Sequence, residues 1–183
     1  MDVETLAIPD VKVITPRVFE DDRGYFTETY TQNKFEKAVT ALNFVQDNES
    51  YSAHKYTVRG LHFQAPPFAQ DKLVRVLKGR VLDVVVDVRK GSPTFGQHVS
   101  AELSAENHRQ LLCPIGFLHA FMTLEDDTLV AYKVTNFYDS ACDGGVYWAS
   151  PELKIDWPVG PELAHLSEKD QKAPPFSAFQ TPF

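Results

Sequence analysis

One short segment, Val58–Lys72 (VRGLHFQAPPFAQDK), gathers most of the polar side chains that could carry chemistry. A histidine titrates near neutral pH and can accept a proton from carbon, while a lysine can stabilise the negative charge that develops on an adjacent carbonyl oxygen. A solvated hairpin face would have the same composition. These side chains flank a Pro-Pro turn and are Arg59, His62, Gln64, Gln70 and Lys72.

The spacing of Arg59 and His62 sets a condition on any shared site. Side chains alternate between the two faces of a strand, so these two residues fall on opposite faces. A bulge at Gly60 would bring them to one face, because an extra residue shifts the alternation. A common site therefore requires that bulge or a wide cavity.

Two more groups with acid–base chemistry lie within apolar strands. His119 in GFLHAF shares a strand face with Phe117 and Phe121, and Tyr132 lies in LVAYKV. Buried histidine and tyrosine side chains more often pack in a core and make one hydrogen bond. Considered alone, both residues are consistent with a structural or a chemical role.

The composition indicates one folded domain over residues 1–183. The chain is 43% hydrophobic and contains 13 phenylalanines, unlike disordered segments, which lack aromatic residues. Its formal net charge of −7 argues against nonspecific binding to nucleic acid, which needs a basic surface. We expect a globular protein that does not bind nucleic acid.

Neither a leader nor a membrane span is expected from the sequence. Residues 1–20 lack a basic stretch followed by an apolar one, and no apolar run approaches the roughly 20 residues of a membrane helix. Cys113 and Cys142 form no CxxC pair, so we expect two thiols in a reducing compartment. The expected location is the cytoplasm, with no membrane partner.

The pattern of strands predicts an all-β fold. Lys72–Val88 reads as a hairpin, because two β-branched runs flank a Lys78-Gly79 turn. In its second arm one face is apolar and expected to be buried, while the other carries Asp83 and Asp87 and is expected to be mixed. Further strands are predicted at Lys12–Thr15, Gly24–Thr29, Asn43–Gln46, Thr57–Leu61, Gln97–Leu103, Gln110–Cys113, Phe117–Leu124 and Thr128–Val134.

Helical signals are few. The best candidate is Gln32–Val39, with Thr31 as a possible N-cap. Many short strands at regular spacing favour a sandwich or barrel, and a jelly roll is one way to close such a sheet. After about residue 150 the chain becomes irregular and rich in proline, and we expect this tail to wrap the β-core.

Several long motifs resemble one enzyme family in content and order. They are DDRGYFTE at 21–28, FVQDNES at 44–50, VRGLHFQ at 58–64, AQDKLVRVLKGRVLDVVVDVR at 69–89 and CPIGFLHAF at 113–121. From about residue 10 to SEKD at 167–170, the chain resembles the dTDP-4-dehydrorhamnose 3,5-epimerase family. The resemblance implies a cupin-like jelly-roll β-sandwich that forms a homodimer, binds a nucleotide sugar and uses no metal or organic cofactor.

The same resemblance implies roles for four residues. His62 would be the general base oriented by Asp170, Lys72 would stabilise an enolate, and Tyr132 would be the acid on the opposite face of the sugar. The implied reaction inverts C3, C5 or both in a nucleotide-diphospho-4-keto-6-deoxyhexose, by default converting dTDP-4-dehydro-6-deoxyglucose to dTDP-4-dehydrorhamnose. Inversion requires a second group because one base working on one face would tend to restore the original configuration.

Binding positions follow from the resemblance in the same way. The arginines and the lysine among them suit a diphosphate through charge-assisted hydrogen bonds. One position departs from the family, since Asp143 in YDSACDGGVYW stands where the family has glutamate and the usual proline is absent. The implied substrate-binding residues are Arg23, Glu28, Gln46, Asn48, Arg59, His119, Asp143 and Lys169.

Other functions compete with a 3,5-epimerase. A single-site epimerase on a related, possibly GDP-linked, keto sugar and a 3,4-ketoisomerase use similar enolate chemistry, and a sugar-nucleotide-binding cupin would have none. Metal-dependent cupins present an HxH pair, whereas Phe63-Gln64 follows His62, so we expect no metal. Deoxysugar supply for a cell-surface polysaccharide is the expected pathway.

Overall fold

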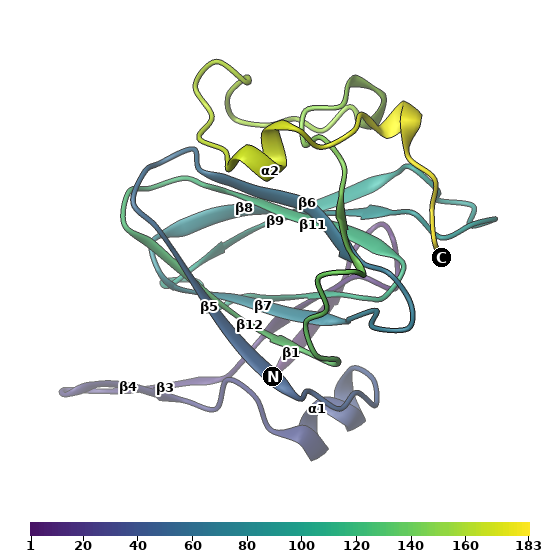
Figure 1. Ribbon diagram of the computed structural model, residues 1–183. Coiled ribbons are helices and arrows are strands. Elements are labelled where there is room, and N and C mark those ends of the chain that lie inside the picture. Colours follow the sequence, from purple (N-terminus) through teal and green to yellow (C-terminus); the bar gives the residue numbers. More distant parts are fainter.

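Two antiparallel sheets face each other in the computed structural model, which describes residues 1–183 (Figure 1). One sheet has six strands, in the order β1 (Asp2–Thr5), β2 (Lys12–Thr15), β10 (Gln110–Cys113), β7 (Lys72–Lys78), β12 (Thr128–Val134) and β5 (Gln46–Ser52). The other has five, in the order β13 (Asp143–Gly145), β6 (Val58–Gln64), β11 (Phe117–Thr123), β8 (Arg80–Asp87) and β9 (His98–Ser104). The predicted all-β sandwich is confirmed.

Helices are short and lie outside the sandwich. They are α1 (Gln32–Ala38), α2 (Glu168–Gln171) and the 3₁₀ turns Pro151–Leu153 and Phe176–Ala178. The predicted helix therefore exists, but Thr31 precedes it without a side-chain capping bond. None of these helices has the length and apolar character needed to span a membrane.

The main core fills the space between the sheets. It consists of β-branched and aromatic side chains from both sheets, as expected where strands bury a complete face. Among its fully buried members are Val74 from β7, Val85 from β8 and Leu111 from β10. Burying such side chains contributes about 1.5–3 kcal/mol each, so this core is the main source of the sandwich's stability.

The outer face of the five-stranded sheet is also buried. Val84, Val86 and Val88 pack there against the C-terminal tail, including Phe179 and Phe183. The expectation of a tail wrapping the core is confirmed. The expectation of one buried and one mixed face on β8 is wrong, because Asp83 and Asp87 lie on the inner face and are also fully buried.

Several predicted strands have the observed bounds, and others do not. The hairpin of β7 and β8, together with β2, β10 and β12, lies where the pattern indicated. The strand predicted at Asn43–Gln46 is wrong, since β5 begins only at Gln46 and runs to Ser52. Its polar residues alternate between half-buried and exposed up to the buried Ser52, so the strand gives no apolar signal.

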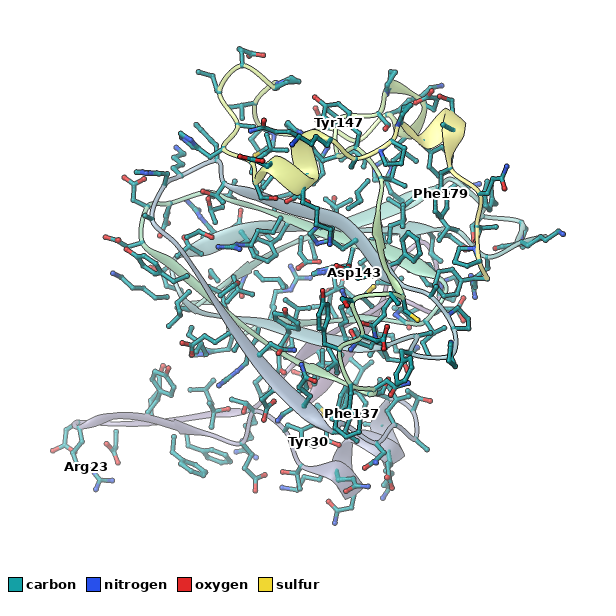
Figure 2. The ribbon with its side chains drawn as sticks, in the orientation of Figure 1. Arg23, Tyr30, Phe137, Asp143, Tyr147 and Phe179 are labelled. Atoms are coloured by element: carbon teal, nitrogen blue, oxygen red, sulfur yellow. The ribbon has the colours of Figure 1, made fainter.

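A separate hairpin, β3 (Val18–Asp21) and β4 (Gly24–Thr27), projects from the sandwich (Figure 1). Arg23 lies at its tip, far from Asp143 (Figure 2). Phe19, Tyr25 and Phe26 on this hairpin are 49%, 61% and 66% exposed. Large aromatic side chains this exposed suggest that another surface covers them.

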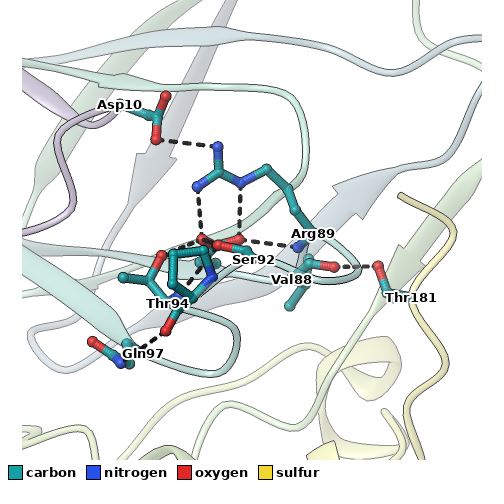
Figure 3. Close-up of polar contacts among 9 residues, drawn as sticks. Asp10, Val88, Arg89, Ser92, Thr94, Gln97 and Thr181 are labelled. Atoms are coloured by element: carbon teal, nitrogen blue, oxygen red, sulfur yellow. Dashed lines mark hydrogen bonds and ion pairs between the residues drawn. The ribbon is translucent and has the colours of Figure 1, made fainter.

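A dense hydrogen-bond network closes the end of β8 (Figure 3). The buried Asp87 carboxylate accepts from the Arg89 backbone and guanidinium at 2.7–3.0 Å, from Ser92 Oγ at 2.6 Å and from Thr94 Oγ1 at 2.5 Å. Arg89 also pairs with Asp10 at 3.1 Å. Burial would raise the pKa of Asp87, but these bonds hold that pKa far below its ordinary value. The network fixes the β8–β9 loop.

Candidate active site

A bulge in β6 brings Arg59 and His62 to one cavity. Between β6 and β11, His119 pairs with His62 and Phe121 with Arg59, so three steps on β6 match two on β11. Gly60 lies within this stretch at φ +122°, and a Cβ there would come within 2.4 Å of the His119 carbonyl oxygen. Only glycine fits both the conformation and the space. The bulge required by the sequence is present.

Two adjoining cavities, of about 380 and 390 Å³, share His62, Lys72 and Tyr132. The first cavity is also lined by Ser50, Thr57, Val58, Arg59, His119, Phe121, Ser167 and Asp170. The second is also lined by Gln46, Asn48, Phe63, Gln64, Gln70, Tyr138, Asp143 and Lys169. Because the two cavities share these three residues, they form one continuous cleft.

His62 forms a dyad with Asp170 in the first cavity. Its Nε2 lies 2.5 Å from Asp170 Oδ1, and the Asp170 side chain is buried. Burial would raise the pKa of Asp170, but hydrogen bonds from His62 and Ser167 and the nearby positive charges lower it. Asp170 therefore stays ionised and directs the proton of His62 to Nε2, which leaves Nδ1 as the basic atom.

The segment before α2 delivers Asp170 to this position. His165 forms a parallel bridge with Thr57, through Val58 N to His165 O at 2.9 Å and His165 N to Tyr56 O at 3.0 Å. Ser167 then caps α2, its Oγ accepting the Asp170 backbone N–H at 3.1 Å. These contacts tie the tail to the strand that carries His62.

Lys72 and Tyr132 line the cleft from the opposite sheet. Lys72 begins β7 and Tyr132 lies in the adjacent strand β12, whereas His62 belongs to the five-stranded sheet. Burial lowers the pKa of Lys72, and burial raises the pKa of Tyr132. In both cases removal from water disfavours the charged form. The phenol therefore keeps its proton at neutral pH and can donate it.

A second histidine–aspartate pair lies beside the first. His119 Nε2 is 2.9 Å from both carboxylate oxygens of Asp83, which is fully buried. The pair fixes the ring of His119 at the cavity wall. Asp83 was not predicted as a site residue, although a carboxylate inside the apolar run LDVVVDV was a usable signal.

The remaining binding candidates divide between the cavities. Arg59 in the first cavity donates to Ser52 Oγ at 3.1 Å and to Tyr51 O at 2.8 Å. In the second cavity, Gln46 Nε2 donates to Asn48 Oδ1 at 2.8 Å. These contacts order the side chains along the cleft before any ligand binds.

Asp143 lies in the second cavity at the start of β13. It forms an ion pair with Lys169 and accepts from Tyr138 Oη at 3.3 Å. Tyr138 is 60% exposed and was not predicted, since an isolated tyrosine in a loop carries no sequence signal. Its exposed ring lines the second cavity and offers an aromatic face to a ligand there.

Arg23 and Glu28 are the two predicted binding residues that this chain does not bring to its own cleft. The Arg23 side chain is 85% exposed and pairs with Asp21 at 2.5 Å. Glu28 pairs with Lys34. Neither residue lines either of the two cavities.

The donor sets in the cleft do not make a metal centre. No group of three or more histidine, cysteine, aspartate or glutamate side chains comes together to hold a metal ion. The two histidine–aspartate pairs instead join each imidazole to its own carboxylate. What the arrangement can do is remove a proton on one side of a ligand, stabilise the resulting anion with Lys72 and return a proton from the other side.

Comparison with known proteins gives a consistent result. The sequence model of the dTDP-4-dehydrorhamnose 3,5-epimerase family matches residues 5–178. A dTDP-4-dehydrorhamnose 3,5-epimerase of Sinorhizobium fredii is 53% identical over 171 residues, covering 93% of this chain and 87% of the relative.

Solved structures agree in fold. The Bacillus anthracis dTDP-4-dehydrorhamnose 3,5-epimerase, crystallised with TDP and PPi, has a TM-score of 0.92 at 49% identity, covering 95% of this chain and 98% of that one. The Legionella pneumophila dTDP-6-deoxy-D-glucose-3,5-epimerase, in complex with dTDP-4-keto-L-rhamnose, also has a TM-score of 0.92, at 41% identity, covering 98% and 94%. The cupin-like β-sandwich implied by the sequence is confirmed.

Proposed function

The chain belongs to the dTDP-4-dehydrorhamnose 3,5-epimerase family, and from this premise we propose that it inverts both C3 and C5 of dTDP-4-dehydro-6-deoxyglucose. The product would be dTDP-4-dehydrorhamnose. The protein is an isomerase of the dTDP-4-dehydrorhamnose 3,5-epimerase type. Its two joined cavities suit a nucleotide sugar, because such a substrate has a nucleotide part and a sugar part. The catalytic roles of His62, Asp170, Lys72 and Tyr132 are part of the proposal.

One observation carries the mechanism. His62 and Tyr132 line the same cleft from opposite sheets, and Lys72 lines it with them. A sugar held between the sheets would present one face to the base and the other to the acid. Inversion at carbon needs such a two-sided arrangement because the proton must return from the face opposite to the one it left.

The first step is proton removal beside the ketone. Nδ1 of His62 takes the proton from C5 or C3, and the electron pair of that C–H bond moves to give an enolate with its charge on O4. Asp170 stabilises the imidazolium through Nε2, at 2.5 Å. The ammonium of Lys72 stabilises the enolate oxygen, and its charge acts strongly because the Lys72 side chain is itself largely removed from water.

The second step is reprotonation. Tyr132 donates its phenolic proton to the same carbon from the other face, and the electron pair on O4 returns to restore the ketone. Solvent then reprotonates the tyrosinate and removes the proton from His62. The raised pKa of Tyr132 keeps the donor protonated between turnovers. Repeating both steps at the second carbon gives the double inversion.

The second cavity suits the nucleotide end. Tyr138 offers an exposed aromatic face for stacking, and Gln46, Asn48 and Asp143 offer amide and carboxylate groups to a pyrimidine or a deoxyribose. Arg59 and Lys169 would meet the diphosphate through charge-assisted hydrogen bonds.

We further propose a homodimer in which β3–β4 reaches the partner. The exposed aromatic residues of this hairpin need a covering surface, and neither Arg23 nor Glu28 lines the two cavities of its own chain. In a symmetric dimer each hairpin could supply both side chains to the cleft of the other chain. The proposed location is the cytoplasm, where the unpaired Cys113 and Cys142 would stay reduced.

Mixing two variants tests the dimer. Sedimentation should give twice the 20.6 kDa mass of one chain. Arg23→Ala and His62→Ala should each be strongly impaired alone, yet random exchange of subunits should restore about a quarter of wild-type activity, because one cleft of each mixed dimer is complete. A monomer, or no restoration after exchange, would contradict the proposal.

Proton NMR of the substrate in deuterium oxide tests the reaction itself. Incubation of dTDP-4-dehydro-6-deoxyglucose with the protein should remove the signals of both H3 and H5 and yield dTDP-4-dehydrorhamnose. Loss of one signal would identify a single-site epimerase. Loss of neither would contradict the proposed substrate, and the GDP-linked analogue would then be assayed in the same way.

A further inference from the structure

Strand β5 carries a row of polar side chains that face the cleft. Every second residue points inward, and the sequence QDNESYS places Gln46, Asn48, Ser50 and Ser52 in this row. Three of the four have hydrogen-bond partners within the chain. Gln46 donates to Asn48 at 2.8 Å, and Ser52 accepts from Arg59 at 3.1 Å.

Ser50 is the exception. Its Oγ is buried and has no hydrogen-bond partner in the chain, although the residue lines the first cavity. A buried hydroxyl without a partner loses the hydrogen bonds that it would make to water, so such groups are rare unless a ligand or a water molecule completes them. Rotation about a single bond moves a serine hydroxyl among three staggered positions, so the oxygen can turn toward the cavity.

The position of Ser50 relative to the acid is also defined. On β12, Val130 is directly opposite Ser50, and Tyr132 is opposite Asn48. Ser50 and Tyr132 are therefore diagonal neighbours on one sheet face, with Cα atoms on the order of 7–8 Å apart. A ligand atom that meets the Ser50 hydroxyl lies on the Tyr132 side of the cleft.

We propose that the Ser50 hydroxyl binds a hydroxyl group of the hexose ring and holds the ring against Tyr132 for reprotonation. The inference rests on the proposed epimerase function and adds a residue that positions the sugar. Ser50 is assigned to the sugar because it lines the first cavity with the base and the second histidine, whereas the candidates for nucleotide binding line the second.

Ser50→Ala tests the assignment, with Ser100→Ala on the exposed face of β9 as the matched control. We expect kcat/KM for dTDP-4-dehydro-6-deoxyglucose to fall about three- to tenfold in Ser50→Ala, the usual effect of one lost hydrogen bond. Affinity for dTDP alone should not change. Deuterium incorporation without inversion should rise relative to inversion, because the ring would no longer be held against the acid.

The outcomes separate this inference from the proposed function. A kcat/KM within twofold of wild type, or an equal loss of affinity for dTDP, would overturn the role of Ser50 while leaving the epimerase intact. Ser100→Ala should match wild type in all three measurements, and equal melting temperatures would show that both variants fold. A wild-type protein that exchanges neither H3 nor H5 would instead contradict the proposed function.

Discussion

The Asp87 network and the cleft differ in how their buried polar groups are hydrogen-bonded within the chain. Asp87 receives hydrogen bonds from Arg89, Ser92 and Thr94, and these lower its pKa despite burial. In the cleft, the pKa values of Lys72 and Tyr132 shift chiefly because burial removes water. One region satisfies its charge within the chain, whereas the other keeps polar groups available to a ligand.

This difference separates stability from function. A saturated network holds one arrangement of the loop after β8, since each lost bond leaves a buried group unpaired. A cleft whose polar groups were equally saturated could not bind the changing charge of a substrate during reaction. Changes in the network should therefore affect unfolding, and changes in the cleft should affect turnover.

The largest separation is expected from His62→Ala. Loss of the general base should reduce kcat by about a thousandfold, within the range observed for such groups. The melting temperature should fall less than in a variant of the Asp87 network, because the His62 ring is partly exposed and Ser167 and Lys169 remain near the Asp170 carboxylate. Exchange of H3 and H5 followed by NMR, together with calorimetry, measures both effects. Near-wild-type exchange would show that another residue is the base.

Asp87→Asn should give the opposite result. Removing the charge leaves Arg89 and two hydroxyl groups with a weaker partner, and we expect a loss of about 2–3 kcal/mol in the free energy of unfolding. At 25 °C kcat/KM should equal that of wild type, since Asp87 lines neither cavity. Urea unfolding and steady-state kinetics measure the two quantities.

The acid limb of stability checks the same residue. Because the pKa of Asp87 is lower in the folded chain than in the unfolded one, its contribution is full above about pH 4 and is lost as the pH falls. Stability of Asp87→Asn should therefore decline less steeply with acid than that of wild type. Parallel slopes would mean that other carboxylates dominate acid unfolding.

Local sequence determined much of the sandwich. The β7–β8 hairpin was predictable because two β-branched runs flank Gly79, whose φ of +80° suits a tight turn. Strands β1, β3 and β13 were not predicted, since segments of three or four residues have no clear period and become strands only by pairing with a neighbour. The helix that carries Asp170 was missed because its four residues are likewise too few to show a period.

The site was predictable in type more than in geometry. Alternation showed that Arg59 and His62 need a bulge, but the close approach of Gly60 to the His119 carbonyl comes from another strand. Ser50 was not predicted because it is distinguished only by a buried hydroxyl without a hydrogen-bond partner, and that depends on all the residues around the cavity. Arg23 was predicted as a binding residue, but it lies at the exposed tip of the β3–β4 hairpin, and strand alternation does not predict that a hairpin projects from the sandwich.

The loss of activity at high pH tests whether burial lowers the pKa of Lys72 in the cleft. Lys72 must be charged to stabilise the enolate, and burial lowers its pKa below the ordinary 10.5. The rate should therefore fall about tenfold per pH unit above a value lower than 10.5, with the cation lost as pH rises. Lys72→Arg should move this limb to higher pH in whatever activity remains. A limb unchanged in Lys72→Arg would assign it to another group.

The smallest effect is expected at Asp170, whose carboxylate, like that of Asp87, is held by hydrogen bonds within the chain. Ser167 caps α2 and contributes to the lowered pKa of Asp170, so Ser167→Ala should raise that pKa and loosen the dyad. We expect kcat to fall about three- to fivefold, the effect of losing one cap of roughly 1 kcal/mol. Because a protonated Asp170 no longer stabilises the imidazolium, the pH below which kcat falls should also move higher. Simple destabilisation of the tail would not cause this shift. Ser167→Asp keeps a capping oxygen. If capping is what holds Asp170 against His62, Ser167→Asp should retain a larger fraction of the wild-type kcat than Ser167→Ala.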